Sequence, residues 1–194
     1  MSQLFRIQLK TTVSRDISAS DSVSYPLELT EILPQSEMLD LFKQSLLNKG
    51  WRQEEDGRLS NTGSVGETLV IDLESKTLVA RLDSEKNVST EVSIDQTVDA
   101  WEKEEAQSYG KSLLDEKVQG VENKLDNESN QLQQSLTQQL IDSEQQRMQL
   151  INEAVQDVYR DALTRKAGQL GEIVSVDEST NSSGEYELVI KVTQ

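Results

Sequence analysis

The sequence predicts an α+β protein: a small antiparallel sheet with one short packing helix, a long inserted helical hairpin or coiled coil, and C-terminal strands that return to the sheet. Three observations predict this class. Apolar and polar residues alternate near both ends of the chain, with the period of half-buried strands. One amphipathic helical pattern lies near residue 40. Residues from about 97 to 167 are rich in helix formers and contain no proline.

The N-terminal residues indicate two strands. Residues 4 to 13 alternate cleanly and predict the first strand. The Ser- and Asp-rich residues 14–22 follow it. Pro26 limits the next apolar residues to an interrupted edge strand, because proline cannot donate to a ladder.

A single amphipathic helix is expected at about 35–49. Pro34 suits its start, and Ser36 could cap that end. Gly50 stands where a helix commonly ends in a left-handed residue. The pattern therefore predicts one helix that packs on the sheet.

Residues 51–94 predict an antiparallel meander. Positions 56–57 read Asp-Gly, a turn signal, because both residues tolerate positive φ. The apolar runs 69–73 and 78–82 predict a hairpin, and the alternating residues 88–94 predict a last strand.

The two largest side chains are Trp51 and Trp101. Their large apolar area makes both of them candidates for the core. We expect Trp51 to anchor the strand after the helix. We expect Trp101 to plug the junction between the long helical region and the sheet.

The helical region carries an apolar stripe with steps mostly of three and four residues, which favours a coiled coil. Residues 126–130 contain Asn and Ser, which could end one helix and cap the next, so we favour a helical hairpin. The alternative is an unbroken helix that pairs with a second copy of the chain. The side chains of the stripe that we expect to bind a partner are Leu132, Leu136, Leu140, Met148 and Ile151.

Two C-terminal strands are predicted at 172–176 and 186–192, joined by the turn-rich residues 177–184. A lone two-stranded hairpin is at best marginally stable in water, so we expect these strands to complete the main sheet. The expected organisation is an α+β head (1–95), a long helical hairpin or coiled coil (96–169) and a strand pair that completes the head (170–194).

Charge and composition exclude several function classes. The formal net charge is -16, which repels phosphate backbones and anionic membrane surfaces, so nucleic-acid and membrane partners are not expected. No apolar run approaches a membrane span, and we expect a cytoplasmic protein. The chain has no cysteine and no histidine, the residues that supply thiolate nucleophiles and most general bases. We therefore expect no catalytic residue, no metal site, no cofactor and no enzymatic activity.

Several phrases of the sequence resemble a known family. They are residues 2–10, the Pro-Leu-Glu-Leu and Ile-Leu-Pro phrases that begin at Pro26 and Ile32, Gly50-Trp51, and the closing runs 170–176 and 185–190. Together these phrases resemble an accessory (X-type) domain protein of bacterial FtsH ternary systems. The resemblance implies a non-enzymatic component that acts with an AAA+ ATPase and with a von Willebrand-type domain protein. More loosely, the chain is similar to a small cyanobacterial and plastid family of unknown function.

The residues and the resemblance lead to two functional hypotheses. The first is a non-enzymatic protein-binding or adaptor module that acts with an AAA+ ATPase in a bacterial multi-component system. The alternative is a structural protein that self-associates through its coiled-coil stripe as a dimer or rod. Sedimentation distinguishes them: a monomer of 21.8 kDa would refute obligate self-association, whereas a dimer would favour it.

Overall fold

The computed structural model describes residues 2–180 and 186–193, and it confirms the α+β class. One antiparallel sheet has five strands in the order β1-β5-β4-β3-β2, and a second sheet pairs β6 with β7. The elements are β1 (Gln3–Pro26), α1 (Gln35–Asn48), β2 (Arg52–Gln53), β3 (Leu59–Thr62), β4 (Thr68–Asp72), β5 (Thr77–Ala100), α2 (Lys103–Asp142), α3 (Glu144–Gly168), β6 (Glu172–Thr180) and β7 (Tyr186–Thr193).

The chain divides into two compact units, and three elements contribute to both. Unit 1 comprises Met1–Asp21 and Asp83–Gln138. Unit 2 comprises Ser22–Leu82 and Gln139–Gln194. The boundaries fall within β1, β5 and α2, so the same strand pair and the same helix serve two different cores.

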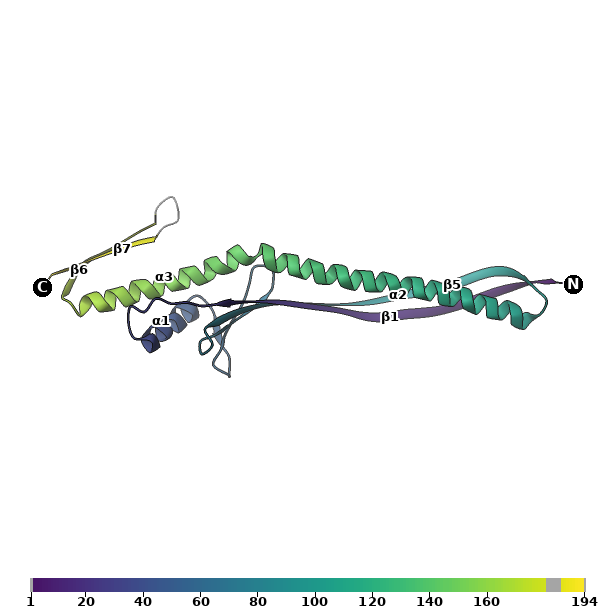
Figure 1. Cartoon of the computed structure of the whole chain (residues 1–194), viewed down its shortest axis with the longest axis horizontal. Helices are drawn as coiled ribbons and strands as arrows, with labels where there is room; N and C mark the ends of the chain where they lie inside the picture. The colour runs from purple at the N-terminus through teal and green to yellow at the C-terminus, as the bar shows by residue number, and fades with distance from the viewer. Residues whose placement is uncertain (1, 181–185, 194) are drawn as a thin grey trace. The chain divides into compact units, whose positions relative to one another are not determined.

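Unit 1 is a ribbon of β1 and β5 with α2 lying along it (Figure 1). Alternation gives the ribbon one apolar face, on which Ile17 and Ile94 are buried. Leu125 is buried on α2. Polar side chains of α2 reach the ribbon backbone: Lys117 Nζ donates to the Ser93 carbonyl at 3.1 Å, and Gln133 donates to the Ser20 carbonyl at 3.1 Å.

A close approach near the start of α2 explains one of the helical glycines. Ile7 packs with Ala100 and Ala106 in a small buried cluster. A Cβ atom on Gly110 would lie 2.7 Å from Ile7 Cγ2, closer than side chains pack. Gly120, in contrast, faces open space. Glycine at 110 therefore lets α2 approach β1.

Unit 2 holds the larger core. The predicted helix is confirmed as α1, which buries Met38, Phe42 and Leu46. The predicted hairpin is confirmed as β4 and the start of β5, with Ile71 opposite Leu78 and both fully buried. Helix α1 packs on α3, and Ser45 Oγ donates to the Ala154 carbonyl at 3.2 Å. The apolar residues of α1, α3 and the sheet thus share one interior.

Two glycines have the positive φ that the sequence predicted for them, but the side-chain cap expected at the start of α1 is absent. Gly50 and Gly57 have φ of 89° and 87°, which confirms the helix end and the Asp-Gly turn. The expected Ser36 cap was wrong. Pro34 is the N-cap residue of α1, and the helix has no side-chain cap hydrogen bond.

Both long strands extend well beyond the apolar patterns that predicted them. Residues 14–22 were not expected to be extended, yet they lie within β1. Residues 88–94 were expected as a separate strand, yet they belong to β5, which begins at Thr77. Cross-strand ion pairs such as Lys10–Glu91 keep the two strands paired where apolar residues are sparse.

The turn expected at 126–130 was wrong, because α2 runs through these residues without a break. Two acidic residues at 126–130 form exposed ion pairs from this helix: Asp126 with Arg15, and Glu128 with Lys86. The interruption comes later, at Ser143, where helical hydrogen bonds still link Ser143 N to the Gln139 carbonyl (3.0 Å) and Arg147 N to the Ser143 carbonyl (3.1 Å). The helical region is one long interrupted helix, and it does not form a hairpin.

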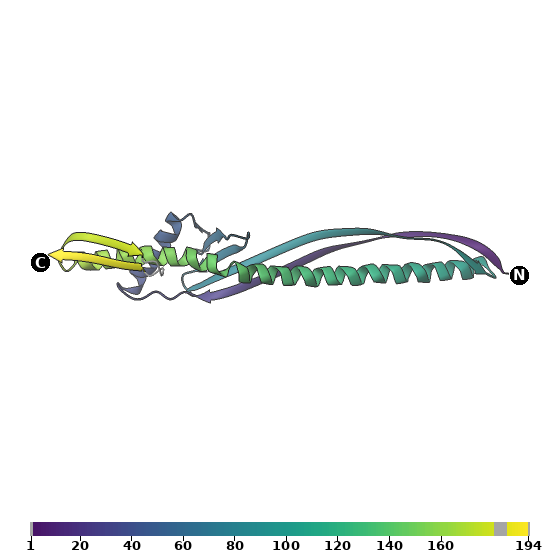
Figure 2. The same ribbon diagram turned by 90° about the horizontal axis from the view of Figure 1, so that it is seen from above.

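The C-terminal strands form their own sheet, so their expected return to the main sheet was wrong. Strands β6 and β7 lie beside α3 and contact it (Figure 2). Arg160 on α3 approaches the Glu178 carboxylate at 3.9 Å. Helix α3 therefore supplies the surface that a lone hairpin requires. The expected turn at 177–184 lies partly outside the described residues, at 181–185.

The expected burial of the two tryptophans was right for one of them. Trp51 follows α1 and is 4% exposed. Trp101 is 70% exposed in the connection between β5 and α2, so its predicted role as a plug was wrong. Its backbone N–H donates to the Glu105 carboxylate at 3.1 Å, and the small residues Ala100 and Ala106 fill the junction instead.

Candidate protein-binding site

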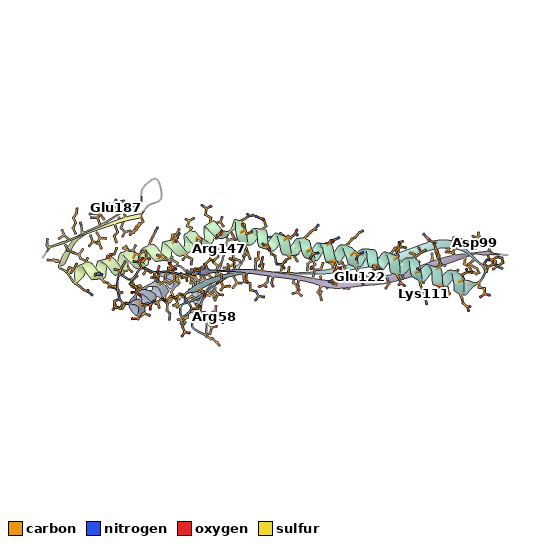
Figure 3. All side chains as sticks on the ribbon, in the orientation of Figure 1. Arg58, Asp99, Lys111, Glu122, Arg147 and Glu187 are labelled. Carbon is orange, nitrogen blue, oxygen red and sulfur yellow. The ribbon has the colours of Figure 1, made fainter. Side chains whose placement is uncertain are left out.

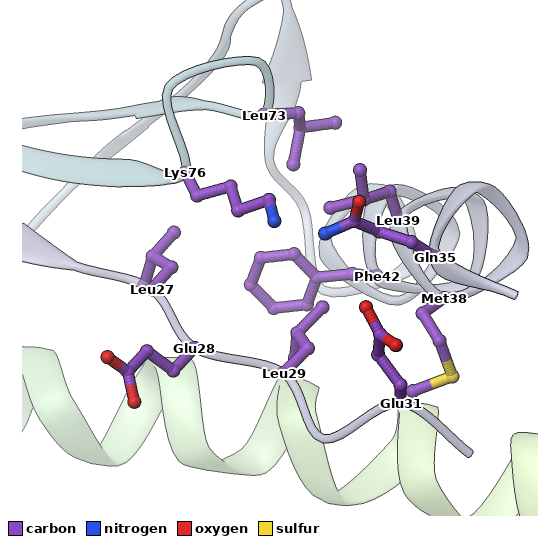
Figure 4. A pocket seen from close by; sticks show the side chains of 10 residues that line it. All are labelled: Leu27, Glu28, Leu29, Glu31, Gln35, Met38, Leu39, Phe42, Leu73 and Lys76. Atoms are coloured by element: carbon purple, nitrogen blue, oxygen red, sulfur yellow. The ribbon is translucent and has the colours of Figure 1, made fainter. Parts of the chain in front are cut away.

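Unit 2 contains a largely apolar groove. It has a volume of about 390 Å³ and lies between the segment 27–31, helix α1 and the turn from β4 to β5 (Figure 4). Its lining residues are mainly apolar, which is typical of ligand and peptide pockets. They are Leu27, Glu28, Leu29, Glu31, Gln35, Met38, Leu39, Phe42, Leu73 and Lys76.

The first wall of the groove is an extended segment that continues β1 past Pro26. Among the described residues, one backbone hydrogen bond from this segment to the sheet is found: Leu27 N donates to the Lys76 carbonyl at 2.8 Å. Further on, Thr30 N donates to the Tyr159 hydroxyl of α3 at 2.9 Å. Because side chains alternate along an extended backbone, Leu27 and Leu29 line the groove from one side of the segment.

Helix α1 supplies the floor. Met38, Leu39 and Phe42 stand at positions i, i+1 and i+4, so they share one face of the helix. Met38 and Phe42 are each only 1% exposed, which makes the floor part of the unit 2 core. The groove therefore rests on packed side chains whose positions are fixed before any partner arrives.

The second wall is the turn from β4 to β5, which is held by Asp72. Its carboxylate accepts the N–H groups of Glu74 at 2.9 Å and Ser75 at 3.2 Å. The hydrogen bond from the Ser75 N–H, followed by that from the Glu74 N–H and by the nearby Arg58 charge, lowers the pKa of Asp72. Lys76 follows with a φ of 52°, a left-handed conformation that directs the chain into β5.

Charged side chains stand at the groove without partners. Figure 4 shows the Glu31 carboxylate and the Lys76 ammonium directed toward the ring of Phe42, whereas the Glu28 carboxylate points away from it. Within the described part of the chain, none of these three side chains forms an ion pair or side-chain hydrogen bond. The groove thus combines an apolar floor with charges that are free to orient a partner.

A buried polar cluster in unit 2 surrounds Arg147, a residue of α3 (Figure 3). Arg147 is 1% exposed and Glu67 is fully buried, with Arg147 Nη1 3.3 Å from Glu67 Oε1. Glu67 Oε2 accepts the Val65 N–H at 2.9 Å. The pair therefore joins α3 to the loop between β3 and β4.

The Arg147 guanidinium also donates hydrogen bonds to polar groups at the interruption between α2 and α3. Arg147 Nη2 donates to the Leu140 carbonyl at 2.5 Å and to the Tyr25 hydroxyl at 3.2 Å, and Nη1 donates to Ser143 Oγ. Its Nε has no partner among the described residues. This cluster is closed to solvent, and its geometry indicates a structural joint that holds β1, α3 and the β3–β4 loop together.

The five residues of the apolar stripe are not gathered at the groove. Leu132 and Leu136 belong to unit 1, and Leu140, Met148 and Ile151 to unit 2. Leu136, Leu140 and Ile151 are each 3% exposed, and Leu132 and Met148 are half-buried. The stripe therefore contributes mainly to the interior of this chain.

Sequence reasoning missed both the groove and the Arg147 cluster. A signal for the cluster was present, because Arg147 and Ser143 continue the stripe between Leu140 and Ile151 in steps of three and four. A charged residue at such a position needs a buried partner. The groove gave no comparable signal, because the turn residues Leu73 and Lys76 meet α1 only after folding.

The described residues offer neither a cluster of metal ligands nor a membrane-spanning helix. They contain no group of three or more acidic residues that could hold a metal ion. No helix within the described ranges is long and apolar enough to span a bilayer.

The chain matches a known protein-family model. Residues 1–193 match the family model described as FtsH ternary system domain X5. No curated protein and no solved structure matches the chain significantly.

Proposed function

Because the chain belongs to the FtsH ternary system domain X5 family, and thus to the accessory parts of a multi-component system, we propose that it is a non-enzymatic adaptor. It binds a protein of that system through the groove formed by residues 27–31, α1 and the β4–β5 turn. The observation that carries the proposal is the groove itself, which pairs an apolar floor with unpaired Glu31 and Lys76.

The residue types available support a role in binding. The chain has neither histidine nor cysteine. Its one fully buried ion pair, among the described residues, is held within a structural joint and faces no open cavity. The groove, in contrast, is open and rests on a rigid floor, which lowers the entropic cost of binding a partner.

The AAA+ ATPase of the same system is the proposed partner, with the von Willebrand-type domain protein as the second candidate. The experiment mixes the full chain with each purified protein and measures the dissociation constant by calorimetry. Leu29→Asp places a charge on the groove wall and is expected to weaken binding at least tenfold. Leu4→Asp is the matched control, because Leu4 is 75% exposed on β1 and does not line the groove.

Thermal melts establish that both variants stay folded. Equal weakening by Leu29→Asp and Leu4→Asp, or the absence of binding to either protein, would contradict the proposal. Sedimentation of the chain alone tests the alternative of self-association. A stable dimer that persists in Leu29→Asp would favour that alternative over the groove.

A further inference from the structure

The backbone beside the groove offers unused hydrogen-bonding groups. Beyond Leu27, the segment has left the sheet, and Thr30 N donates to Tyr159 of α3. Within the described part of the chain, the N–H groups of Glu28, Leu29 and Glu31 donate to no acceptor. Ile32 N donates to the Thr30 carbonyl at 3.0 Å, so the chain turns at Glu31, and only Glu28 and Leu29 offer unpaired backbone groups that can serve as a template for another strand.

The direction of the free groups favours the groove side. In an extended chain, the N–H groups of residues i and i+2 point to the same edge. The N–H of Leu27 points toward β5, where it meets the Lys76 carbonyl. The N–H of Leu29 therefore points to the same edge, and β5, which begins at Thr77, leaves that edge open beyond Leu27.

Charge then selects the kind of segment that would fit. The Glu31 carboxylate faces the groove without a partner, and the whole chain carries a formal charge of -16. A basic side chain on the Glu31 side of the groove, away from the Lys76 ammonium that faces the same groove, would be favoured both by this carboxylate and by the net negative charge of the chain. Leu29, Leu39 and Leu73 line the groove and are partly exposed, so they favour an aliphatic side chain next to them.

Building on the proposed function, we propose that the groove binds an extended segment of the partner protein. The segment adds as a short strand beside Glu28 and Leu29, places an aliphatic side chain against the partly exposed Leu29, Leu39 and Leu73, and directs a Lys or Arg toward Glu31. Main-chain hydrogen bonds would supply affinity, and the alternating side chains would supply specificity, as in other cases of strand addition.

The probe is a fluorescein-labelled peptide, Gly-Lys-Leu-Thr-Leu-Lys-Gly, titrated with the full chain by anisotropy. A second peptide carries Glu in place of both lysines, and a third is N-methylated at the threonine amide. We expect the lysine peptide to bind with a Kd below about 1 mM, and each of the other two peptides to bind at least tenfold more weakly.

Two variants separate recognition by the groove from general attraction to an acidic protein. Glu31→Gln is expected to weaken the lysine peptide about fivefold. Glu122→Gln removes the same charge from an exposed position on α2 and is expected to leave binding unchanged. Equal losses in both variants would overturn the proposal, as would undiminished binding of the N-methylated peptide or a helical bound peptide in transferred NOE spectra.

The outcome also separates this inference from the proposed function. If the ATPase binds the intact chain and Leu29→Asp abolishes that binding, while no peptide binds, the adaptor role stands and strand addition fails. If the lysine peptide binds at the groove but neither system protein does, strand addition stands and the proposed partner is wrong.

Discussion

Units 1 and 2 differ in their ion pairs: unit 2 buries one, whereas unit 1, among the described residues, buries none. Unit 1 places its ion pairs on the surface: in Arg6–Asp95 the two side chains are 68% and 51% exposed. Unit 2 places one such pair, Arg147–Glu67, at 1% and 0% exposure. All buried polar or charged residues of the described chain, Ser45, Glu67, Ser143 and Arg147, lie in unit 2.

The difference implies that charge pairs fix register in unit 1 but hold the tertiary structure in unit 2. An exposed pair contributes about 0–1 kcal/mol, because water screens it. Breaking a buried pair costs about 3–5 kcal/mol, because one charge remains without solvent or partner. The two units should therefore respond very differently to the loss of one arginine.

The largest expected effect is that of Arg147→Ala. It leaves the Glu67 carboxylate buried without its cation and removes the guanidinium hydrogen bond to the Leu140 carbonyl. We expect unit 2 to lose about 3–5 kcal/mol of unfolding free energy. Urea denaturation followed by Trp51 fluorescence, in a Trp101→Phe background, reports on unit 2, because Trp51 is buried there.

Arg160→Ala is the matched control on the same helix. Arg160 is 38% exposed and pairs with Asp157 and Asp161. Its loss should cost less than about 1 kcal/mol. Equal costs for the two arginines would remove the distinction between buried and exposed pairs on which the comparison of the two units depends.

The same contrast explains how much of the fold could be predicted. Helix α1 and the β4–β5 hairpin belong to unit 2, where dense apolar residues give a clear period. Residues 14–22 are Ser- and Asp-rich, and their pairing with β5 depends on contacts such as Asp16–Asn87, 71 positions apart. No local pattern specifies such a contact, so the length of the ribbon was missed.

The groove was missed for a similar physical reason. Leu29 and Phe42 each fit an ordinary core pattern, and only the path of the chain after Pro26 leaves a space between them. Trp101 was misplaced because size alone favours burial. Because Ala100, Ala106 and Gly110 are small, α2 approaches β1 closely at that junction, and no room is left for an indole.

Alanine substitutions at two glycines of α2 are expected to change the stability of unit 1 by an intermediate amount, with opposite signs. Gly110→Ala places a Cβ 2.7 Å from Ile7 Cγ2, which belongs to a stiff β-branched side chain. Overpacking of this kind costs about 1–3 kcal/mol, and the gain in helix propensity returns about 1 kcal/mol. We expect a net loss of up to about 2 kcal/mol.

Gly120→Ala meets nothing within 4 Å, so it should stabilise unit 1 by about 1 kcal/mol through helix propensity alone. Hydrogen exchange of α2 amides measures both changes within unit 1. Stabilisation by both substitutions would mean that α2 does not approach β1 at Gly110.

The smallest expected effect concerns the exposed pair Arg6–Asp95 in unit 1. Arg6 Nε and Nη2 donate to the two Asp95 carboxylate oxygens at 2.9 and 2.7 Å, and Gln8 donates at 2.9 Å. The hydrogen bonds from Arg6, followed by the one from Gln8, lower the pKa of Asp95 to about 2. Carboxyl titration by NMR should therefore find a midpoint near 2 in the intact chain, and Arg6→Ala should raise it toward the ordinary value of about 4.

The sign of the pH dependence follows from that lowered pKa. The unfolded chain takes up the proton near its ordinary pKa of about 4, before the folded chain does, so acid favours the unfolded state. The contribution of Asp95 is thus present above about pH 4 and is lost as the pH falls toward 2. The melting temperatures of the intact chain and of Asp95→Asn should differ slightly at pH 6 and become equal near pH 2. They should also become equal at 1 M salt, where the Debye length falls to about 3 Å. A difference that persists in acid or in salt would show that Asp95 stabilises unit 1 by something other than its charge, and the ribbon would then resemble unit 2 more closely than its exposed ion pairs imply.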